Sequence, residues 1–136
     1  MIRIFDFFIA LIGIIILMPL IIFISLILYL ENKSPFFFQK RIGKNLKYFT
    51  LIKFRTMSKG TKNCATHLVD SSRITTLGAF LRKTKLDEIP QLWNVLKGEM
   101  SFVGPRPCLP IQTELIKFRK ELNIHIVVPG ITGLAQ

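Results

Sequence analysis

The chain opens with an apolar run that carries no charged residue from Phe7 to Leu30. The run is about 24 residues long and would measure roughly 36 Å as an α-helix, enough to cross the hydrocarbon core of a bilayer. It is too long for a secretory signal, and no small-residue cleavage site follows it. Pro19 lies near its middle, where the missing N–H can bend a helix. The pattern therefore predicts a membrane-inserted helix with a bend.

The charges that flank this segment bear on its topology. Arg3 precedes the segment, whereas several basic residues follow it: Lys33, Lys40, Arg41, Lys44 and Lys47. Basic flanks favour the cytoplasmic side of a membrane. A straight helix would place Arg3 outside, while a helix bent at Pro19 would return to the face that it entered. Charge and proline leave both a single span and re-entry open, and a span is the simpler reading because spanning helices tolerate proline.

Short elements and turns follow the membrane segment. Phe36–Phe38 and Tyr48–Phe54 have the composition of two short strands, with Gly43 and Asn45 as turn formers between them. Residues 58–73 are polar and have no apolar period, so we expect a loop there.

Three apolar patterns with helical spacing come next. They are marked by Leu77, Phe80 and Leu81, then by Ile89, Leu92, Trp93 and Leu96, and then by Ile111, Leu115, Phe118 and Leu122. Gly98 should end the second helix. Gly130 and Gly133 are free to take positive φ near the end of the chain. The expected fold class is mainly α, or α+β with a short β-hairpin.

Charge narrows the classes of partner. The 136 residues include 19 Lys and Arg against 8 Asp and Glu, a net charge of +11. This balance favours nucleic acid, acidic lipid or a phosphorylated substrate. Asn32 to Val69 holds nine basic residues and no acid, and it adjoins the membrane segment. Because the sequence has no recognisable nucleic-acid-binding module, we expect no nucleic-acid partner.

The cysteines and histidines indicate no site of their own. Cys64 and Cys108 are far apart in the sequence, and neither His67 nor His125 has a partner at metal-ligand spacing. The sequence therefore indicates no disulfide framework, and we expect a domain that faces the reducing cytosol.

Two adjacent acids, Asp87 and Glu88, precede the second helical pattern. Asp87 suits the N-cap position, with Pro90 in the first turn, and capping alone would explain the pair. A functional alternative is equally concrete. A helix N-terminus lowers the pKa of a carboxylate and attracts phosphate, and such a carboxylate can attack phosphorus to form an acyl phosphate. The second carboxylate would then hold a divalent cation on the phosphates.

Several basic residues are candidate phosphate ligands, although each also has a structural explanation. Lys53 and Arg55 would lie on the wet side of a strand, and Arg82 on a solvated helix face. Arg106 stands between Pro105 and Pro107, where restricted backbone freedom suits a positioned ligand.

Taken together, these residues resemble a known family. The resemblance rests on "RIFDF" (3–7), "FFQKRIG" (37–43), "KFRTM" (53–57), "LDEIPQLWNVLKGEMSFVGPRP" (86–107) and "PGITGLAQ" (129–136). These motifs closely resemble the bacterial sugar transferases, the monotopic polyprenyl-phosphate phosphoglycosyl transferases. The resemblance covers nearly the whole chain.

The resemblance implies a reaction and a set of site residues. Asp87 would attack the β-phosphate of a UDP-sugar, UMP would leave, and polyprenyl (undecaprenyl) phosphate would then take the phosphosugar. Glu88 would join Asp87 in catalysis and help to bind Mg²⁺. The implied substrate-binding residues are Lys53, Arg55, Arg82 and Arg106. The product would initiate synthesis of exopolysaccharide, O-antigen, capsule or a glycoprotein glycan.

The resemblance also implies an architecture. Residues 1–31 would form a re-entrant membrane helix, and residues 32–136 a small catalytic domain with interfacial amphipathic helices. The domain would contact membrane lipid at the cytoplasmic face of the bacterial inner membrane.

Three departures from the family pattern accompany the match. Met18 stands before Pro19 where Ser is common, and Val127 and Val128 stand where a basic residue is common. The family continues for tens of residues beyond "PGITG", so we expect the domain to be truncated after Gln136. The alternative function is a non-catalytic membrane adaptor that binds anionic lipid through the basic stretch.

Overall fold

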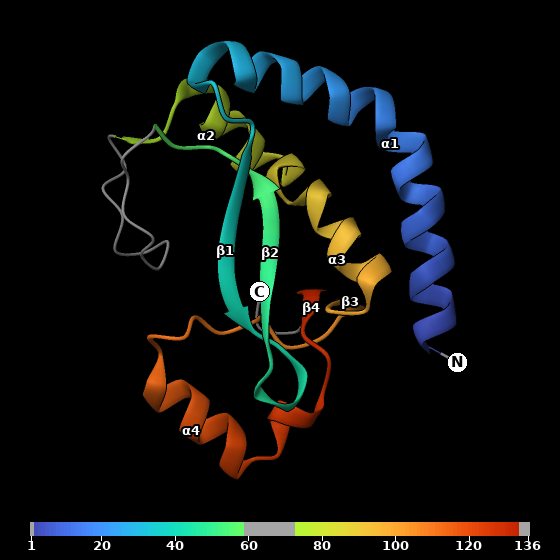
Figure 1. The fold of residues 1–136 in the computed structure, drawn as a ribbon, viewed down its shortest axis with the longest axis vertical. Helices are drawn as coiled ribbons and strands as arrows, with labels where there is room; N and C mark the ends of the chain where they lie inside the picture. Colours follow the sequence, from blue (N-terminus) through green and yellow to red (C-terminus); the bar gives the residue numbers. More distant parts are fainter. Residues whose placement is uncertain (1, 59–72, 134–136) are drawn as a thin grey trace.

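The computed structural model describes residues 2–58 and 73–133, and its longest element is the helix α1 (Ile2–Asn32). Figure 1 shows that α1 bends partway along and that its two arms point in different directions. Pro19 lies inside this helix. Its missing N–H and the clash of its ring with the preceding turn account for the bend that the sequence predicts.

Most side chains of α1 are apolar and exposed. The buried residues of the helix are Asp6, Ala10, Ile24 and Leu28. Within the described residues, α1 is the one helix long and apolar enough to cross a membrane, by length and composition. An apolar surface that the protein does not cover fits a membrane anchor.

A β-hairpin forms the centre of the molecule (Figure 1). β1 (Phe36–Ile42) pairs antiparallel with β2 (Tyr48–Phe54), as predicted, but β1 continues well beyond the expected end at Phe38. A short 3₁₀ turn, η1 (Lys44–Leu46), joins the strands. Asn45 takes the left-handed conformation there, with φ of 55°. Asn tolerates this conformation better than most residues.

One face of the hairpin combines apolar and basic side chains. Directly opposed residues of an antiparallel pair share a face. The register pairs Phe37 with Lys53, Gln39 with Leu51, and Arg41 with Phe49, so these six residues lie on the same face. Phe49 and Leu51 of this face enter the core, while its polar members are available to the site described below.

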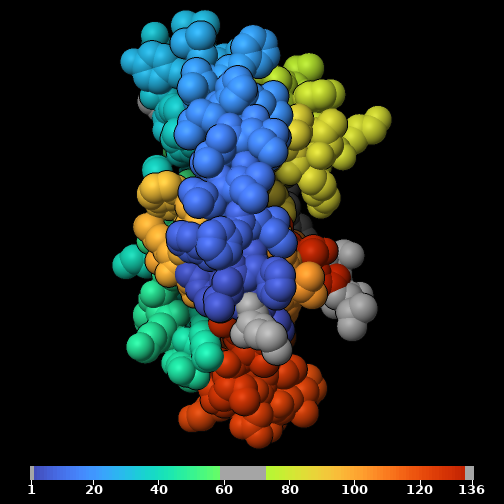
Figure 2. Space-filling model, turned by 90° about the vertical axis from the view of Figure 1, so that its right-hand side faces the viewer, coloured from blue at the N-terminus to red at the C-terminus, as the bar shows by residue number. Residues whose placement is uncertain are grey.

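Two clusters of buried apolar residues join α1 to the rest of the protein. The first contains Ala10, Phe49, Leu51, Leu92, Val95 and Met100, and the second contains Ile24, Leu28, Phe54 and Leu81. Each cluster therefore includes residues from a different part of α1. Figure 2 shows α1 lying along one face of the molecule, against the elements that follow.

The first predicted helix is α2 (Thr76–Lys83). The second predicted helix is divided into two elements, the 3₁₀ helix η4 (Leu86–Gln91) and the α-helix α3 (Leu92–Lys97). Gly98 ends α3 with φ of 84°, as predicted. The expected apolar stripe is wrong at Trp93, whose side chain is 51% exposed, whereas Asn94 is fully buried. The 3₁₀ segment turns by a different angle per residue, so the faces do not follow the uniform helical spacing.

A short parallel pair of strands was not predicted. β3 (Ser101–Val103) pairs with β4 (Gly130–Thr132). Gly130 and Gly133 do not use their freedom to take positive φ. They are needed for close approach instead, because a Cβ at Gly130 would lie 2.1 Å from the Gly104 nitrogen and one at Gly133 would lie 2.5 Å from the Gly104 oxygen.

The end of the molecule farthest from α2 is formed by α4 (Thr113–Glu121) and the 3₁₀ turn η5 (Ile124–Ile126) (Figure 1). The third predicted helix is thus confirmed. Its apolar stripe is not covered by the described chain, since α4 has no buried residue and Phe118 is 57% exposed.

Candidate functional site

The acid pair lies in the first turn of η4, directly after a left-handed residue. Lys85 occupies the N-cap position of η4 with φ of 59°, so the prediction that Asp87 is the N-cap is wrong. The Lys85 carbonyl accepts a hydrogen bond from the Glu88 N–H at 3.2 Å. The tight 3₁₀ turn thus begins two residues before Asp87.

Asp87 is a buried carboxyl group with an altered acidity. It is 6% exposed. Burial and the neighbouring Glu88 raise the pKa of Asp87, and Lys53 and Arg82 oppose that rise. The expectation that a helix N-terminus would lower this pKa is wrong, because loss of hydration and the like charge outweigh the nearby cations. An oxygen with a raised pKa is more basic, which suits a nucleophile.

A pocket beside the acid pair is lined by charged side chains. It is an open hollow whose polar lining comprises Arg41, Lys53, Glu88, Gln91 and Arg106. Three of the predicted site residues, Lys53, Glu88 and Arg106, therefore come together from β2, η4 and the segment after β3. Asp87 and Arg82 stand next to them, because both shift the pKa of Lys53 through their charges.

Arg82, in the last turn of α2, is held by a residue that follows β2. Its Nε donates to Thr56 Oγ1 at 2.8 Å. The backbone of α2 approaches the same residue closely, since a Cβ at Gly78 would lie 2.1 Å from the Thr56 carbonyl oxygen. This close contact brings the last turn of α2 towards the site.

Lys53 and Arg55 share one aromatic neighbour. Lys53 Nζ lies 5.4 Å, and the Arg55 guanidinium carbon 5.7 Å, from the centre of the Phe37 ring. Burial lowers the pKa of Lys53, and Asp87 opposes that change. Arg55 donates instead to the Phe36 carbonyl at 3.4 Å, and it is not part of the pocket lining. The structure therefore brings Lys53 to the acids but leaves Arg55 at the end of the hairpin.

Arg41 is a site residue that the sequence reasoning missed. It is 8% exposed, and its guanidinium donates to Gln39 Oε1 at 3.1 and 2.7 Å and to the Pro107 carbonyl at 3.0 Å. Burial and then Arg106 lower the pKa of Arg41 to about 10. The alternation of side chains along a strand could have found it. If the first predicted strand is extended to Ile42, Arg41 lies on the same face as Phe37, and Phe37 is paired with Lys53.

Asn94 joins the strand that carries Lys53 to the helix that follows the acids. Its Oδ1 accepts from the Ile52 N–H at 3.1 Å, and its Nδ2 donates to the Thr50 carbonyl at 2.7 Å. The buried amide thus satisfies the backbone groups of β2 as a neighbouring strand would. It fixes the distance between β2 and α3, and hence between Lys53 and the acid pair.

The carboxylates at the site suit a metal held jointly with a substrate. The described residues contain no group of three or more His, Cys, Asp and Glu side chains placed to hold a metal. Mg²⁺ commonly takes one or two carboxylates and completes its octahedron with water and substrate phosphate oxygens. Asp87 and Glu88, whose like charges repel one another, fit that donor set.

Comparison with known proteins decides the family. A sequence profile described as bacterial sugar transferase matches residues 1–136. The chain belongs to the bacterial sugar transferase family.

Named relatives of this bacterial sugar transferase occur in several bacteria. A Bacillus subtilis protein provisionally named undecaprenyl-phosphate N-acetylgalactosaminyl 1-phosphate transferase is 41% identical over 96% of this chain and 70% of its own length. The uncharacterized sugar transferase EpsL of the same species is 43% identical over 98% of this chain and 66% of its own length. The UDP-N-acetylgalactosamine-undecaprenyl-phosphate N-acetylgalactosaminephosphotransferase of Aeromonas hydrophila is 37% identical over 96% of this chain and 32% of its own length.

This bacterial sugar transferase thus spans between 32% and 70% of the length of these relatives. The family membership confirms the resemblance noted in the sequence. The site geometry adds one buried cation, Arg41, and removes Arg55 from the immediate pocket.

Proposed function

We propose that this bacterial sugar transferase moves a sugar-1-phosphate from a UDP-sugar to undecaprenyl phosphate through a covalent aspartyl intermediate. The observation that carries the proposal is a buried Asp87, paired with Glu88, beside a pocket that is lined by cations. A diphosphate needs such cations, and a carboxylate with a raised pKa suits the attack on phosphorus. The names of the relatives, which include undecaprenyl-phosphate acceptors, support this substrate class.

In the first step a carboxylate oxygen of Asp87 attacks the β-phosphorus of the donor. A new O–P bond forms, and the bond between the β-phosphorus and the bridging oxygen breaks. UMP leaves with that electron pair, and the phosphosugar stays on Asp87. Lys53 and Arg82, which interact electrostatically with Asp87, stabilise the negative charge on the transferring oxygens.

In the second step a phosphate oxygen of undecaprenyl phosphate attacks the same phosphorus. The bond from Asp87 to phosphorus breaks, the carboxylate is restored, and the product is undecaprenyl-diphosphate-sugar. Arg106, which lines the pocket, supplies charge to the incoming phosphate.

Glu88 would hold Mg²⁺ together with the donor phosphates. When bound, the ion supplies positive charge to the diphosphate oxygens and favours departure of UMP. Glu88 lines the pocket directly, so it is the carboxylate that we assign to the ion.

The same proposal includes a re-entrant α1 and a cytoplasmic site. The Arg3 guanidinium donates to the Val95 and Leu96 carbonyls at the end of α3, the latter at 2.8 Å. Asp6 accepts from Ser101 Oγ at 2.7 Å. These contacts tie the start of α1 to the domain that begins directly after its end, and a straight span would separate the two. Both basic flanks would then lie on the cytoplasmic side.

The test is UMP release by the full chain in membranes. Membrane fractions are incubated with a panel of UDP-sugars, undecaprenyl phosphate and Mg²⁺, and the Asp87→Asn variant serves as the matched control. We expect UMP with at least one donor, none from the variant, and none in excess EDTA. A folded, membrane-bound chain that releases no UMP with any donor would favour the non-catalytic adaptor.

A further inference from the structure

Arg106 depends on its backbone for its position. Its side chain is exposed overall while it lines the pocket, and its guanidinium has no hydrogen-bond partner among the described residues. Pro105 and Pro107 on either side have fixed φ and no N–H to donate. The direction of the Arg106 side chain is therefore set by whatever holds the carbonyls of this segment.

Each carbonyl of the segment accepts a hydrogen bond from a different element. The Gly130 N–H of β4 donates to the Pro105 carbonyl at 3.0 Å. Arg119 Nη1 of α4 donates to the Arg106 carbonyl at 2.6 Å. Arg41 Nη1 of β1 donates to the Pro107 carbonyl at 3.0 Å. Charge-assisted bonds of this kind are shorter and stronger than neutral ones.

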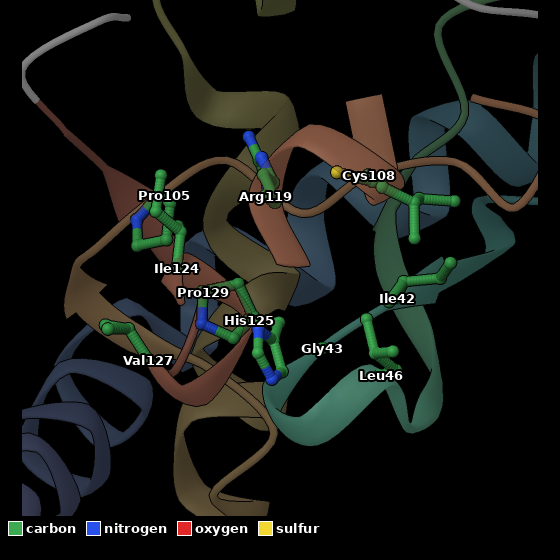
Figure 3. A pocket seen from close by; sticks show the side chains of 11 residues that line it. Ile42, Gly43, Leu46, Pro105, Cys108, Arg119, Ile124, His125, Val127 and Pro129 are labelled. Atoms are coloured by element: carbon green, nitrogen blue, oxygen red, sulfur yellow. The ribbon is translucent and has the colours of Figure 1, made fainter. Parts of the chain in front are cut away.

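Packing holds only part of this segment. Pro107 and Cys108 are buried, whereas Pro105 is partly exposed and Arg106 is exposed. An open hollow lies beside Pro105, Cys108 and Arg119 (Figure 3). The polar bonds to the carbonyls therefore carry much of the positioning at the exposed end of the segment, where Arg106 stands.

We propose that Arg119 is a positioning residue for Arg106. Its guanidinium holds the Arg106 carbonyl, and so aims the Arg106 side chain into the pocket without touching substrate itself. This gives the exposed helix α4 a part in the reaction. The inference rests on the proposed function, because Arg106 matters only if the pocket binds phosphate.

A double-mutant cycle tests the coupling in the full chain. Arg119→Met should lower kcat/KM for UMP release about tenfold, and Arg119→Lys should restore part of it because lysine can still donate. In an Arg106→Gln background, Arg119→Met should lower it less than twofold. Lys120→Met on the same exposed helix makes the same charge change and should leave the rate near wild type. An equal loss in both backgrounds, or no loss in either, would overturn the proposal.

Labelling of Cys108 gives a second readout that needs no turnover. Cys108 follows Pro107 and is 3% exposed, so a thiol reagent reaches it only when the segment opens. In a Cys64→Ser background, Arg119→Met should speed its labelling severalfold. Burial raises the pKa of Cys108 and the Arg119 charge opposes that rise, so loss of this charge alone would slow the reaction. Faster labelling must therefore come from opening.

The two readouts separate the possible failures. Unchanged or slower Cys108 labelling in Arg119→Met would overturn the positioning role of Arg119, whatever the rate of UMP release. If Arg119→Met is labelled faster but the wild-type protein releases no UMP, the positioning role of Arg119 is supported and the proposed function is contradicted.

Discussion

Asp87 combines burial, a like-charged neighbour and a proposed covalent role. A carboxylate in such a place reduces the stability of the fold, because burial and Glu88 oppose its ionised form. Lys53 and Arg82 recover part of that loss, but the net pKa shift is upward. Active sites often retain such groups at the expense of stability.

Asp87→Asn should therefore raise the melting temperature at neutral pH by a few degrees. A raised folded-state pKa means that the protonated group favours folding, and that this contribution is lost as pH rises through the folded pKa. Asn keeps a neutral side chain at every pH. The gain should thus be largest near pH 7 and should vanish below the usual Asp pKa.

Thermal unfolding of both proteins in the same detergent, across pH, measures this. A variant less stable than wild type at pH 7 would contradict the sign, and would show that the attraction of the Lys53 and Arg82 charges outweighs burial.

At this scale the sequence was informative about residue types but not about their environment. The motif around Asp87 and Glu88 identified the acid pair, and proline neighbours singled out Arg106. Burial of Asp87, however, depends on packing between η4 and the hairpin, which no local pattern records. Arg41 was missed because the predicted strand ended at Phe38, three residues too early to include it.

At the scale of elements, local periodicity predicted the hairpin and the helices, but not the boundary between η4 and α3 or the pairing of β3 with β4. A single helical pattern from Ile89 to Leu96 covers the change from η4 to α3. The strands β3 and β4 are each three residues long and pair across a long stretch of sequence. Strand propensity over so few residues carries little information. The pairing depends on glycines that allow two distant segments to approach closely, which no local pattern records.

The close approach of Gly130 to Gly104 gives a prediction about this pairing. In Gly130→Ala, the new Cβ would meet the Gly104 backbone nitrogen at 2.1 Å, and backbone cannot move aside cheaply. We expect a loss of about 2–4 kcal/mol in the free energy of unfolding, as for other overpacked sites. Because a shift of this backbone would also disturb the hydrogen bond from the residue 130 N–H to the Pro105 carbonyl, UMP release should fall as well.

Gly13→Ala is the matched control. Its Cβ would make an ordinary contact, 3.4 Å from Leu92 Cδ1, and alanine is the better helix former. Denaturant unfolding should show this variant at or above wild-type stability. Equal stability of the two variants would show that the glycine contact does not hold the strands.

For the whole molecule, α1 and the domain form one packed unit. Both arms of α1 contribute to buried clusters, and Arg3 and Asp6 bond to groups near the end of α3 and in β3. The sequence supplied the bend through Pro19, but only the structure brings the start of the helix back to the domain. This arrangement leads to a prediction about topology.

A cysteine at position 2, introduced as Ile2→Cys in a background without Cys64 and Cys108, reports on which side of the membrane the chain begins. A membrane-impermeant thiol reagent should not label it in intact cells and should label it after permeabilisation, because Arg3 contacts the Leu96 carbonyl of the same domain. A cysteine in the hairpin turn, in place of Lys44, gives the cytoplasmic reference. Labelling of position 2 in intact cells would establish a true span and contradict re-entry.

The central claim is that Asp87 becomes covalently bound to the phosphosugar. The direct measurement is incubation with a UDP-sugar labelled in the sugar, with Mg²⁺ and without undecaprenyl phosphate, followed by denaturation and mass spectrometry. We predict up to one labelled phosphosugar per chain, located on Asp87, cleaved by hydroxylamine and discharged when undecaprenyl phosphate is added before denaturation. Asp87→Asn should carry none. Label retained on the Asn variant, or wild-type turnover with no labelled protein at any time, would contradict it.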